Sequence, residues 1–380
     1  MKAATTLFVV SVGALLSIGL VMLYSAGMRP SAVQGGARFL LMQLVWCGIG
    51  LAACTIAAWM DYRWLKKLAW PLFGLAVVML GLVLIPGIGV EKKGAWRWFD
   101  LGFGNFQPSE AAKLALIVAL AHYADTHQHV MTTFKRGLLI PGFLVSVVVG
   151  LIFIEPDRGT AILMSAVSGV LLLIAGVRWS YLLPPMVAAA GGLAYSLWHD
   201  PLRLGRILSW LNPEAHKEGI GFQAWQAQIA LGAGGWNGLG LGNGRQKLGF
   251  VPEHHTDFIL SVIGEELGVI ATLATVLLFI ILVICGIYIA WNSRDTFGMF
   301  LGSGITFLIG LQALINIGVV TGVFPNKGLP LPFISYGGSN LLLMLTCVGI
   351  VLSIARHLRD PVAMRSEEFS ANEVLAPQNS

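Results

Sequence analysis

Four ionisable side chains stand together in the segment PEHHTDF, immediately before a long apolar run: Glu253, His254, His255 and Asp257. Histidines next to carboxylates are typical of metal sites, but neither HExxH nor another standard zinc spacing is present. A carboxylate at the mouth of a buried run is partly desolvated, which raises its pKa and suits a general base. Asp257 is best placed for that role because it directly precedes the expected helix. Capping that helix is the competing role for the same side chain.

The stretch before this cluster, GAGGWNGLGLGNGRQK, is rich in glycine and ends in Arg245, Gln246 and Lys247. Glycine lets backbone amides approach an anion closely, and two neighbouring cations suit a phosphate or pyrophosphate. The pattern is not a dinucleotide-binding fingerprint, because no strand, helix and acidic residue surround it at the required spacings. The stretch is therefore either a phosphate-binding loop or a plain flexible loop.

A pair of opposite charges lies within FQPSEAAKLALIVAL, where Glu110 and Lys113 are three residues apart. This spacing places both side chains on one face of a helix, where they can form an ion pair. Ionisable residues at membrane depth are costly and mark functional sites. The pair either lines a polar cavity or anchors the helix at the interface.

Charges also gather in two short connections. The turn IEPDRGTAI contains Glu155, Asp157 and Arg158, which is more charge than a helical hairpin needs, although a solvated turn is the alternative. In KKGAWRWFDLG, Arg97 stands between two tryptophans. Tryptophan is enriched at membrane interfaces, so anchoring is one explanation, and an arginine held there could grip a phosphate through two hydrogen bonds.

A proline-rich stretch near the C-terminus, NKGLPLPFISYGGSNLL, carries Ser335, Tyr336, Ser339 and Asn340. Proline stiffens the backbone and cannot continue a helix, and the glycine pair that follows favours a turn. The stretch is therefore expected to form one wall of a ligand groove, with Ser335 and Ser339 as candidate binding residues.

The elements that must position these residues are membrane helices. The 380-residue chain is 56% hydrophobic and 11% charged, with a mean hydropathy of +0.77, whereas soluble domains carry roughly 25% charged residues. Apolar runs long enough to span a bilayer recur from end to end, which predicts an all-α polytopic membrane protein. The ten expected transmembrane helices cover residues 5–26, 40–59, 68–88, 109–124, 138–154, 160–176, 181–197, 258–291, 298–320 and 338–356.

The placement of the charges and of the cysteines gives two further predictions. The net charge is +5, but basic residues occur singly or in pairs, so no nucleic acid partner is expected. The four cysteines fall inside apolar runs without a CxxC pair and are interpreted as packing residues.

The basic residues of the short connections favour one side, which places both termini in the cytoplasm. Residues 1–360 then form a single membrane domain. Its large extracytoplasmic loop, 198–257, lies between the seventh and eighth helices. Residues 361–380 are polar and are expected to form a disordered cytoplasmic tail.

Several segments, taken in order, resemble the SEDS family (shape, elongation, division and sporulation) over roughly residues 5–357. They are KGAWRWFDLG, FQPSEAAKLA, EPDRGTA, GLGLGNGRQKLGFVPEHHTDFILSVIGEELG and PLPFISYGGSNLL. Several independent motifs in sequence order are more specific than any single pattern. The GNGRQK and PFISYGGSNL segments are more similar to the division branch than to the elongation branch.

The resemblance implies a ten-helix enzyme of the bacterial inner membrane that polymerises lipid II into glycan strands at the outer face, at the division septum. Its implied partners are a class B penicillin-binding protein transpeptidase and other divisome proteins. The aspartate of the family's PExHTDF motif, regarded as catalytic, is here Asp257. The glutamate and lysine of FQPSExxK and the aspartate of PDxGT correspond to Glu110, Lys113 and Asp157. Gly249 stands where an acidic residue is expected, so no role at that position carries over.

The mechanism expected from this resemblance is a glycosyl transfer. Asp257 takes the proton of the acceptor GlcNAc 4-hydroxyl, which attacks the anomeric carbon of the donor and expels undecaprenyl pyrophosphate. The candidate cations for that leaving group are Arg97, Lys113, Arg158, Arg245 and Lys247. The other candidate substrate-binding residues are Glu110, Asp157, Gln246, Glu253, His255, Ser335 and Ser339.

No metal ligand and no certain cofactor are assigned, and a divalent cation bound through the substrate pyrophosphate stays open. Three alternatives also stay open: a lipid II flippase, a scaffold that recruits a division synthase, and an elongation-type polymerase.

Overall fold

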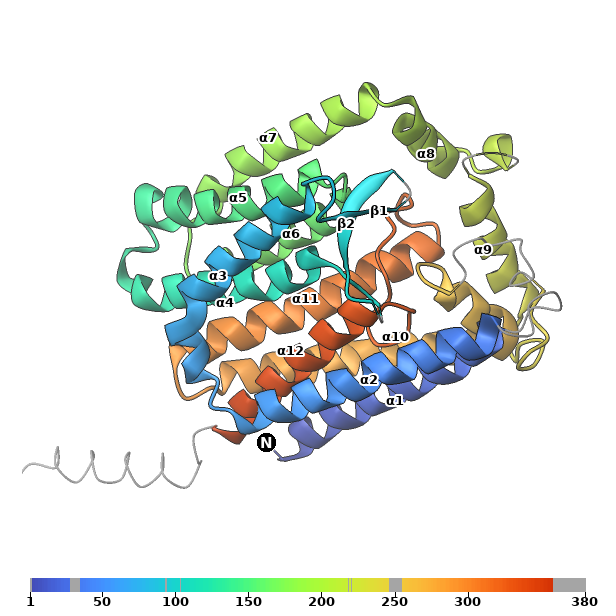
Figure 1. Ribbon diagram of the computed structural model, residues 1–380, viewed down its shortest axis with the longest axis horizontal. Coiled ribbons are helices and arrows are strands. Elements are labelled where there is room, and N and C mark those ends of the chain that lie inside the picture. The colour runs from blue at the N-terminus through green and yellow to red at the C-terminus, as the bar shows by residue number, and fades with distance from the viewer. Residues whose placement is uncertain are drawn as a thin grey trace, which may run out of the picture.

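The computed structural model describes residues 2–357 apart from 28–34, 93, 103, 218, 220 and 246–254 (Figure 1). For 35–38, 92, 193 and 201–203 only the backbone is described. The expected tail at 361–380 lies outside the described residues.

Helices dominate the described chain. They are α1 (Lys2–Ala26), α2 (Gly35–Trp59), α3 (Arg63–Val83), α4 (Pro108–Thr126), α5 (Ile140–Ile154), α6 (Arg158–Ile174), α7 (Trp179–Trp198), α8 (Pro201–Leu211), α9 (Phe222–Ala233), α10 (Ile259–Trp291), α11 (Thr296–Val320) and α12 (Gly338–Arg356). Short helical turns η1 (Gln128–Val130), η2 (Phe134–Leu139) and η3 (Glu214–His216) join some of them.

Each of the ten predicted apolar spans overlaps a helix, and the described chain is mostly helical, as predicted. Within the described residues, seven helical stretches are long and apolar enough to cross a bilayer. Of the remaining predicted spans, α6 has only 17 residues and α4 carries charge in its first turn. The segment predicted as one large loop contains α8, η3 and α9.

The bundle is built from closely packed helix pairs. α2 packs along α12, α1 along α10, and α3 along α4, while α11 contacts α10, α4 and α6 (Figure 1). Small residues allow these close approaches. At Gly349 of α12, an added Cβ would overlap the backbone oxygen of Cys54 in α2. All four cysteines are free and three are buried, as packing residues would be.

α7 borders the bundle at its edge (Figure 1), where it contacts α8 and η2. Most of its described side chains are exposed, including Leu183, Met186, Val187 and Tyr195. Exposed apolar side chains along a helix of a membrane protein are expected to face lipid.

A small antiparallel sheet departs from the all-α prediction. It contains β1 (Val90–Lys92), β2 (Ala95–Asp100) and β3 (Asn105–Phe106), in the order β1-β2-β3. Gly94 adopts a φ of +74° where β1 turns into β2, a conformation that suits glycine. The sheet holds the arginine and tryptophans of KKGAWRWFDLG on an ordered strand shortly before α4.

The predicted span 258–291 is one helix by hydrogen bonding but has a kink. Gly268 lies inside α10 with φ +79° and ψ −177°, which only glycine adopts readily. The first part of α10, 259–267, is therefore a separate helical segment that follows Asp257. No sequence period distinguishes the two parts, because both are apolar.

Candidate functional site

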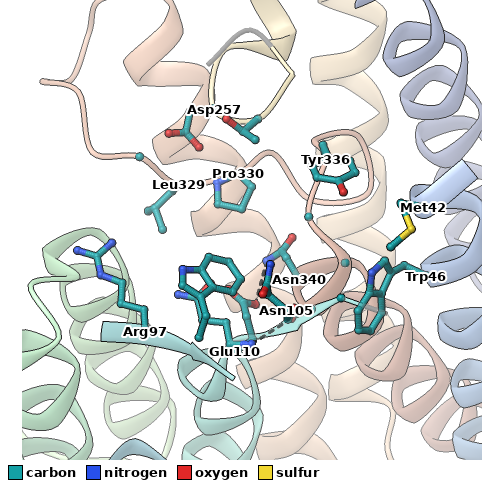
Figure 2. Close-up of a pocket in the computed structure, with 18 of the residues that line it drawn as sticks. Met42, Trp46, Arg97, Asn105, Glu110, Asp257, Leu329, Pro330, Tyr336 and Asn340 are labelled. Atoms are coloured by element: carbon teal, nitrogen blue, oxygen red, sulfur yellow. Dashed lines mark hydrogen bonds between the residues drawn. The ribbon is translucent and has the colours of Figure 1, made fainter. Parts of the chain in front are cut away.

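A cavity of about 960 Å³ opens between the sheet, α2, α4, α6 and the segments before α10 and α12 (Figure 2). Its lining contains six of the side chains singled out from the sequence: Arg97, Glu110, Asp157, His255, Asp257 and Ser339. It also contains aromatic and amide side chains, among them Phe39, Trp46, Trp98, Asn105, Gln107, Tyr336 and Asn340. Distant motifs of the sequence thus share one site.

Asp257 lies on the cavity wall opposite Glu110, as Figure 2 shows. Its backbone is held by Asn316 of α11, whose side-chain nitrogen donates to the backbone oxygens of Asp257 at 2.8 Å and Leu329 at 2.6 Å. An added Cβ at Gly328 would lie 3.3 Å from Asp257 Oδ2. The N-cap of α10 is Phe258, one residue after Asp257, so the cap position predicted for Asp257 is off by one.

The segment 329–340 folds against the turn that carries Asp257. Ser335 Oγ donates to the backbone oxygen of Thr256 at 2.5 Å and accepts from the backbone nitrogen of Leu331 at 2.8 Å. The backbone nitrogen of Tyr336 donates to the backbone oxygen of His255 at 2.9 Å. Ser335 therefore joins two walls of the site and is not among the residues that line the cavity.

Glu110 and Lys113 form the predicted ion pair, with Lys113 Nζ 2.8 Å from Glu110 Oε2. The ammonium also donates to Gln312 Oε1 at 3.1 Å, and Asn340 Nδ2 donates to Glu110 Oε2 at 3.0 Å. Lys113 is fully buried, whereas Glu110 reaches the cavity. A buried charge is stable only when paired and hydrogen-bonded, and this arrangement meets both conditions.

Asp157 is the N-cap of α6. Its carboxylate accepts from the backbone nitrogen of Thr160 at 3.1 Å and from Thr160 Oγ1 at 2.9 Å. Gln107, which precedes α4, donates its side-chain nitrogen to Asp157 Oδ2 at 3.4 Å. The carboxylate therefore fixes the start of α6 while it lines the cavity.

Arg97 of β2 reaches the cavity from the wall that the sheet forms (Figure 2). Its Nε donates to the backbone oxygen of Glu155 at 2.6 Å. The Glu155 side chain is fully buried, and neither of its carboxyl oxygens has a hydrogen-bond partner in the described part of the chain. Burial raises the pKa of Glu155 to about 8, with a further upward contribution from Asp157 and an opposing one from Arg97. This carboxyl is therefore protonated at neutral pH.

The glycine-rich stretch binds carboxylates of its own chain. The backbone nitrogens of Gly242 and Arg245 donate to Glu266 Oε2 at 3.0 Å and to Glu265 Oε1 at 2.8 Å. Ser25 of α1 donates to the same Glu266 oxygen at 2.5 Å. In the described stretch up to Arg245, the anions that these amides bind are therefore carboxylates of α10.

Two other candidate cations in the described part of the chain do not line the cavity. Arg158 lies at the start of α6 but does not line the site, and Arg245 is exposed at the end of the glycine-rich stretch. Gln246, Lys247 and Glu253 lie outside the described residues. Within the described ranges, no group of three or more histidine, cysteine or acidic side chains is placed to hold a metal ion.

The structure adds amide residues that the sequence reading missed. Gln312 and Asn316 stand four apart on α11 and connect Lys113, the turn at Asp257 and the segment 329–330. The sequence did contain a signal for these two residues, because polar side chains inside an apolar span are costly and need a partner.

Comparison with known proteins shows which family the chain matches. Residues 5–360 match the sequence profile of the family described as "Cell cycle protein", which covers FtsW, RodA and SpoVE. A protein of Trichlorobacter lovleyi named "Probable peptidoglycan glycosyltransferase FtsW" is 44% identical over 348 residues, 91% of each chain.

Two solved structures have the same fold. One, described as "Structural coordination of polymerization and crosslinking by a peptidoglycan synthase complex", has a TM-score of 0.77 at 31% identity and covers 92% of this chain and 96% of its own. The rod shape determining protein RodA of Thermus thermophilus has a TM-score of 0.70 at 29% identity, covering 93% and 97%. With matching motifs, fold and near full-length coverage, this chain belongs to the SEDS family of cell cycle proteins.

Proposed function

We propose that the chain is a peptidoglycan glycosyltransferase that polymerises lipid II into glycan strands at the outer face of the inner membrane. The observation that carries this proposal is the cavity in which Asp257 faces Arg97 and the paired Glu110. The relatives named as peptidoglycan glycosyltransferases support the reaction class.

In the proposed reaction Asp257 is the general base. It takes the proton of the acceptor GlcNAc 4-hydroxyl, and the hydroxyl oxygen bonds to the anomeric carbon of the donor. The bond from that carbon to the phosphate oxygen breaks, so undecaprenyl pyrophosphate leaves with the electron pair. A carboxylate in a partly desolvated cavity is a stronger base than one in water, which suits this proton transfer.

Arg97 is placed to stabilise the leaving group. Its Nε is fixed by the backbone oxygen of Glu155, and the residue lines the cavity, so its terminal guanidinium nitrogens are assigned to the leaving group. A planar guanidinium matches phosphate oxygens through two parallel hydrogen bonds. Charge that develops on the pyrophosphate is then met by a cation already in position, which is usually the largest single effect in such a site. A divalent cation that arrives with the pyrophosphate would add to the same effect.

Lys113 has a different proposed role. Because its ammonium is buried between Glu110 and Gln312, it acts on the substrate through the orientation of Glu110. Glu110, Asp157, His255 and Ser339 line the cavity and are proposed to contact the sugar and peptide parts of lipid II. Gln246, Lys247 and Glu253 keep the substrate-binding role proposed from the sequence.

We place the reaction at the division septum, as the FtsW names of the relatives suggest. The proposed topology has ten transmembrane helices, cytoplasmic termini, and the segment 198–257 outside the cytoplasm. The proposed partner is a class B penicillin-binding protein transpeptidase within the divisome. A fold shared with a peptidoglycan synthase complex that coordinates polymerisation and crosslinking supports such a partner.

The test is reconstitution. The purified protein, with and without a class B penicillin-binding protein, is incubated with fluorescently labelled lipid II in liposomes, and the products are separated on a gel. Glycan polymer that depends on this chain supports the proposal. Translocation of lipid II across the bilayer without polymer, in the presence of a competent partner, would instead identify a flippase.

A further inference from the structure

A second group of cations lies outside the central cavity, where α6 begins and α7 ends. Its members are Arg158 at the start of α6, Arg206 on α8, and Lys327 in the segment between α11 and α12. None of the three lines the cavity that contains Asp257. We name this group the lateral cluster.

Arg158 is held in place, but not all of its side-chain nitrogens form hydrogen bonds within the described chain. Its Nη2 donates to Ser196 Oγ of α7 at 2.5 Å, and its guanidinium lies 5.2 Å from the centre of the Phe153 ring. Its Nε and Nη1 atoms are buried and have no hydrogen-bond partner among the described residues. Buried donors of a charged group that lack partners carry a desolvation cost, which a bound anion would remove.

Lys327 is brought to this place by close backbone packing. An added Cβ at Gly159 would lie 2.6 Å from the backbone oxygen of Lys327, so the chain passes directly over the start of α6. A side chain at position 159 would force this backbone away. The result is a lysine beside the arginine that follows Asp157.

The charges of the lateral cluster are not balanced. Burial lowers the pKa of Lys327, and the neighbouring Arg158 and then Arg206 lower it further. Asp200, between α7 and α8, is the acidic residue whose charge acts on Arg158 in the described part of the chain. Three neighbouring cations, of which Arg158 feels the charge of Asp200, leave an excess of positive charge that suits an anion with more than one charge.

The surroundings of the lateral cluster are apolar. Phe153 and Ile154 at the end of α5, and Tyr195 and Trp198 at the end of α7, are exposed at 39%, 64%, 69% and 75%. Aromatic and aliphatic side chains around a basic group are typical of the membrane interface, where lipid head groups lie. A free phosphate in water would gain nothing from them.

We infer that the lateral cluster binds the phosphate or pyrophosphate head group of a membrane lipid, with the lipid tail along the exposed face of α7. Arg158 supplies its two unpartnered nitrogens to one phosphate, and Lys327 and Arg206 meet the remaining oxygens. The inference rests on the proposed function only for the choice of a polyprenyl lipid as the ligand, since binding needs no glycosyl transfer.

The test measures binding rather than turnover. The purified full-length protein in detergent is titrated with undecaprenyl pyrophosphate while its melting temperature is followed, because a ligand that binds the folded state raises it. Undecaprenol, which lacks the phosphates, and inorganic pyrophosphate, which lacks the tail, are titrated in parallel. The variants are Arg158→Gln, Lys327→Gln and Arg206→Gln, and the last is expected to fold normally because Arg206 is exposed.

Two further variants separate the possible sites. Arg178→Gln, beyond the opposite end of α6, is the matched control, and Arg97→Gln removes the cation that lines the central cavity among the described residues. The half-saturating concentration of undecaprenyl pyrophosphate is expected to rise about tenfold in Arg158→Gln, the loss of one good charge-assisted contact. Arg206→Gln shifts it in the same direction, and Arg178→Gln leaves it close to the wild-type value. Arg97→Gln also weakens binding, because the central cavity is proposed to hold the same head group, so the inference depends on the additional loss in Arg158→Gln and Arg206→Gln.

Equal responses of all variants, or a loss confined to Arg97→Gln, would overturn the inference. An inorganic pyrophosphate titration that matches the lipid would overturn its lipid component, because the tail would then contribute nothing. Asp257→Asn separates the inference from the proposed function, since it is expected to keep this binding while it loses polymer formation. A failure of the lipid-binding inference can therefore be distinguished from a failure of the proposed polymerase function.

Discussion

Glu155 is a fully buried carboxyl beside the cavity whose oxygens have no partner in the described structure. Its pKa rises from 4.5 to about 8, first through burial and then through the charge of Asp157. Between these two pH values the folded protein holds a proton that the unfolded chain has released. The stability that this proton provides is therefore present in full below about pH 4.5 and is lost as the pH rises to about 8.

The change Glu155→Gln removes this dependence, because glutamine has the same shape and no ionisation. The variant is expected to be more stable than the wild type near pH 8, by roughly a few kcal/mol at most, and the difference shrinks as the pH falls toward 4.5. Thermal unfolding in detergent at several pH values measures it. A constant difference between the two proteins across this range would show that Glu155 does not titrate during unfolding.

At the scale of elements, one ion pair joins three helices. Glu110 and Lys113 of α4 bind Asn340 of α12 and Gln312 of α11. Such a pair contributes little net stability compared with apolar residues, but the loss of one partner leaves a charge uncompensated in a fully buried place.

Glu110→Gln is therefore expected to destabilise the protein by about 3–5 kcal/mol, because Lys113 stays buried without its counter-charge. The double change Glu110→Gln with Lys113→Met removes both charges and is expected to recover much of that loss. Melting temperatures of the single and the double variant, measured side by side, test this prediction. If the double variant proves no more stable than the single one, the ion pair is not the reason for the loss.

A second prediction at this scale concerns the kink in α10. An added Cβ at Gly268 would overlap the backbone oxygen of Trp236, and its φ of +79° disfavours any side chain. Gly268→Ala is thus expected to push the glycine-rich stretch away from Glu265 and Glu266. Limited proteolysis within 234–245 should become faster. Gly142→Ala in α5, where an added Cβ meets nothing within 4 Å, is the control that keeps the wild-type rate.

At the scale of the whole molecule, each apolar run of spanning length overlaps a helix, but hydropathy missed α8 and α9 inside the segment predicted as a loop. The sheet at 90–106 was missed, since its strands are short and its tryptophans were explained by the membrane interface alone. The kink at Gly268 was missed because the residues on both sides are equally apolar. Both features are set by tertiary contacts that local composition does not report.

Only part of the candidate site could be predicted from the sequence, again because tertiary contacts determine the rest. Residue type and motif identified Asp257, Arg97 and Asp157, and the cavity contains all three. Spacing along the chain could not tell that Ser335 joins two walls, or that Arg158 points to α7. The roles of Gln312 and Asn316 depend on which helices meet, and that follows from packing.

The most direct test of the central claim is polymer formation from labelled lipid II by Asp257→Asn, measured beside the wild type. Asp61→Asn, between α2 and α3 and away from the cavity, serves as the matched control. If Asp257 is the general base, Asp257→Asn keeps the wild-type melting temperature and loses polymer formation by at least about 100-fold, the range of general base catalysis, while Asp61→Asn stays active. Polymer formation by Asp257→Asn at the wild-type rate would contradict the account.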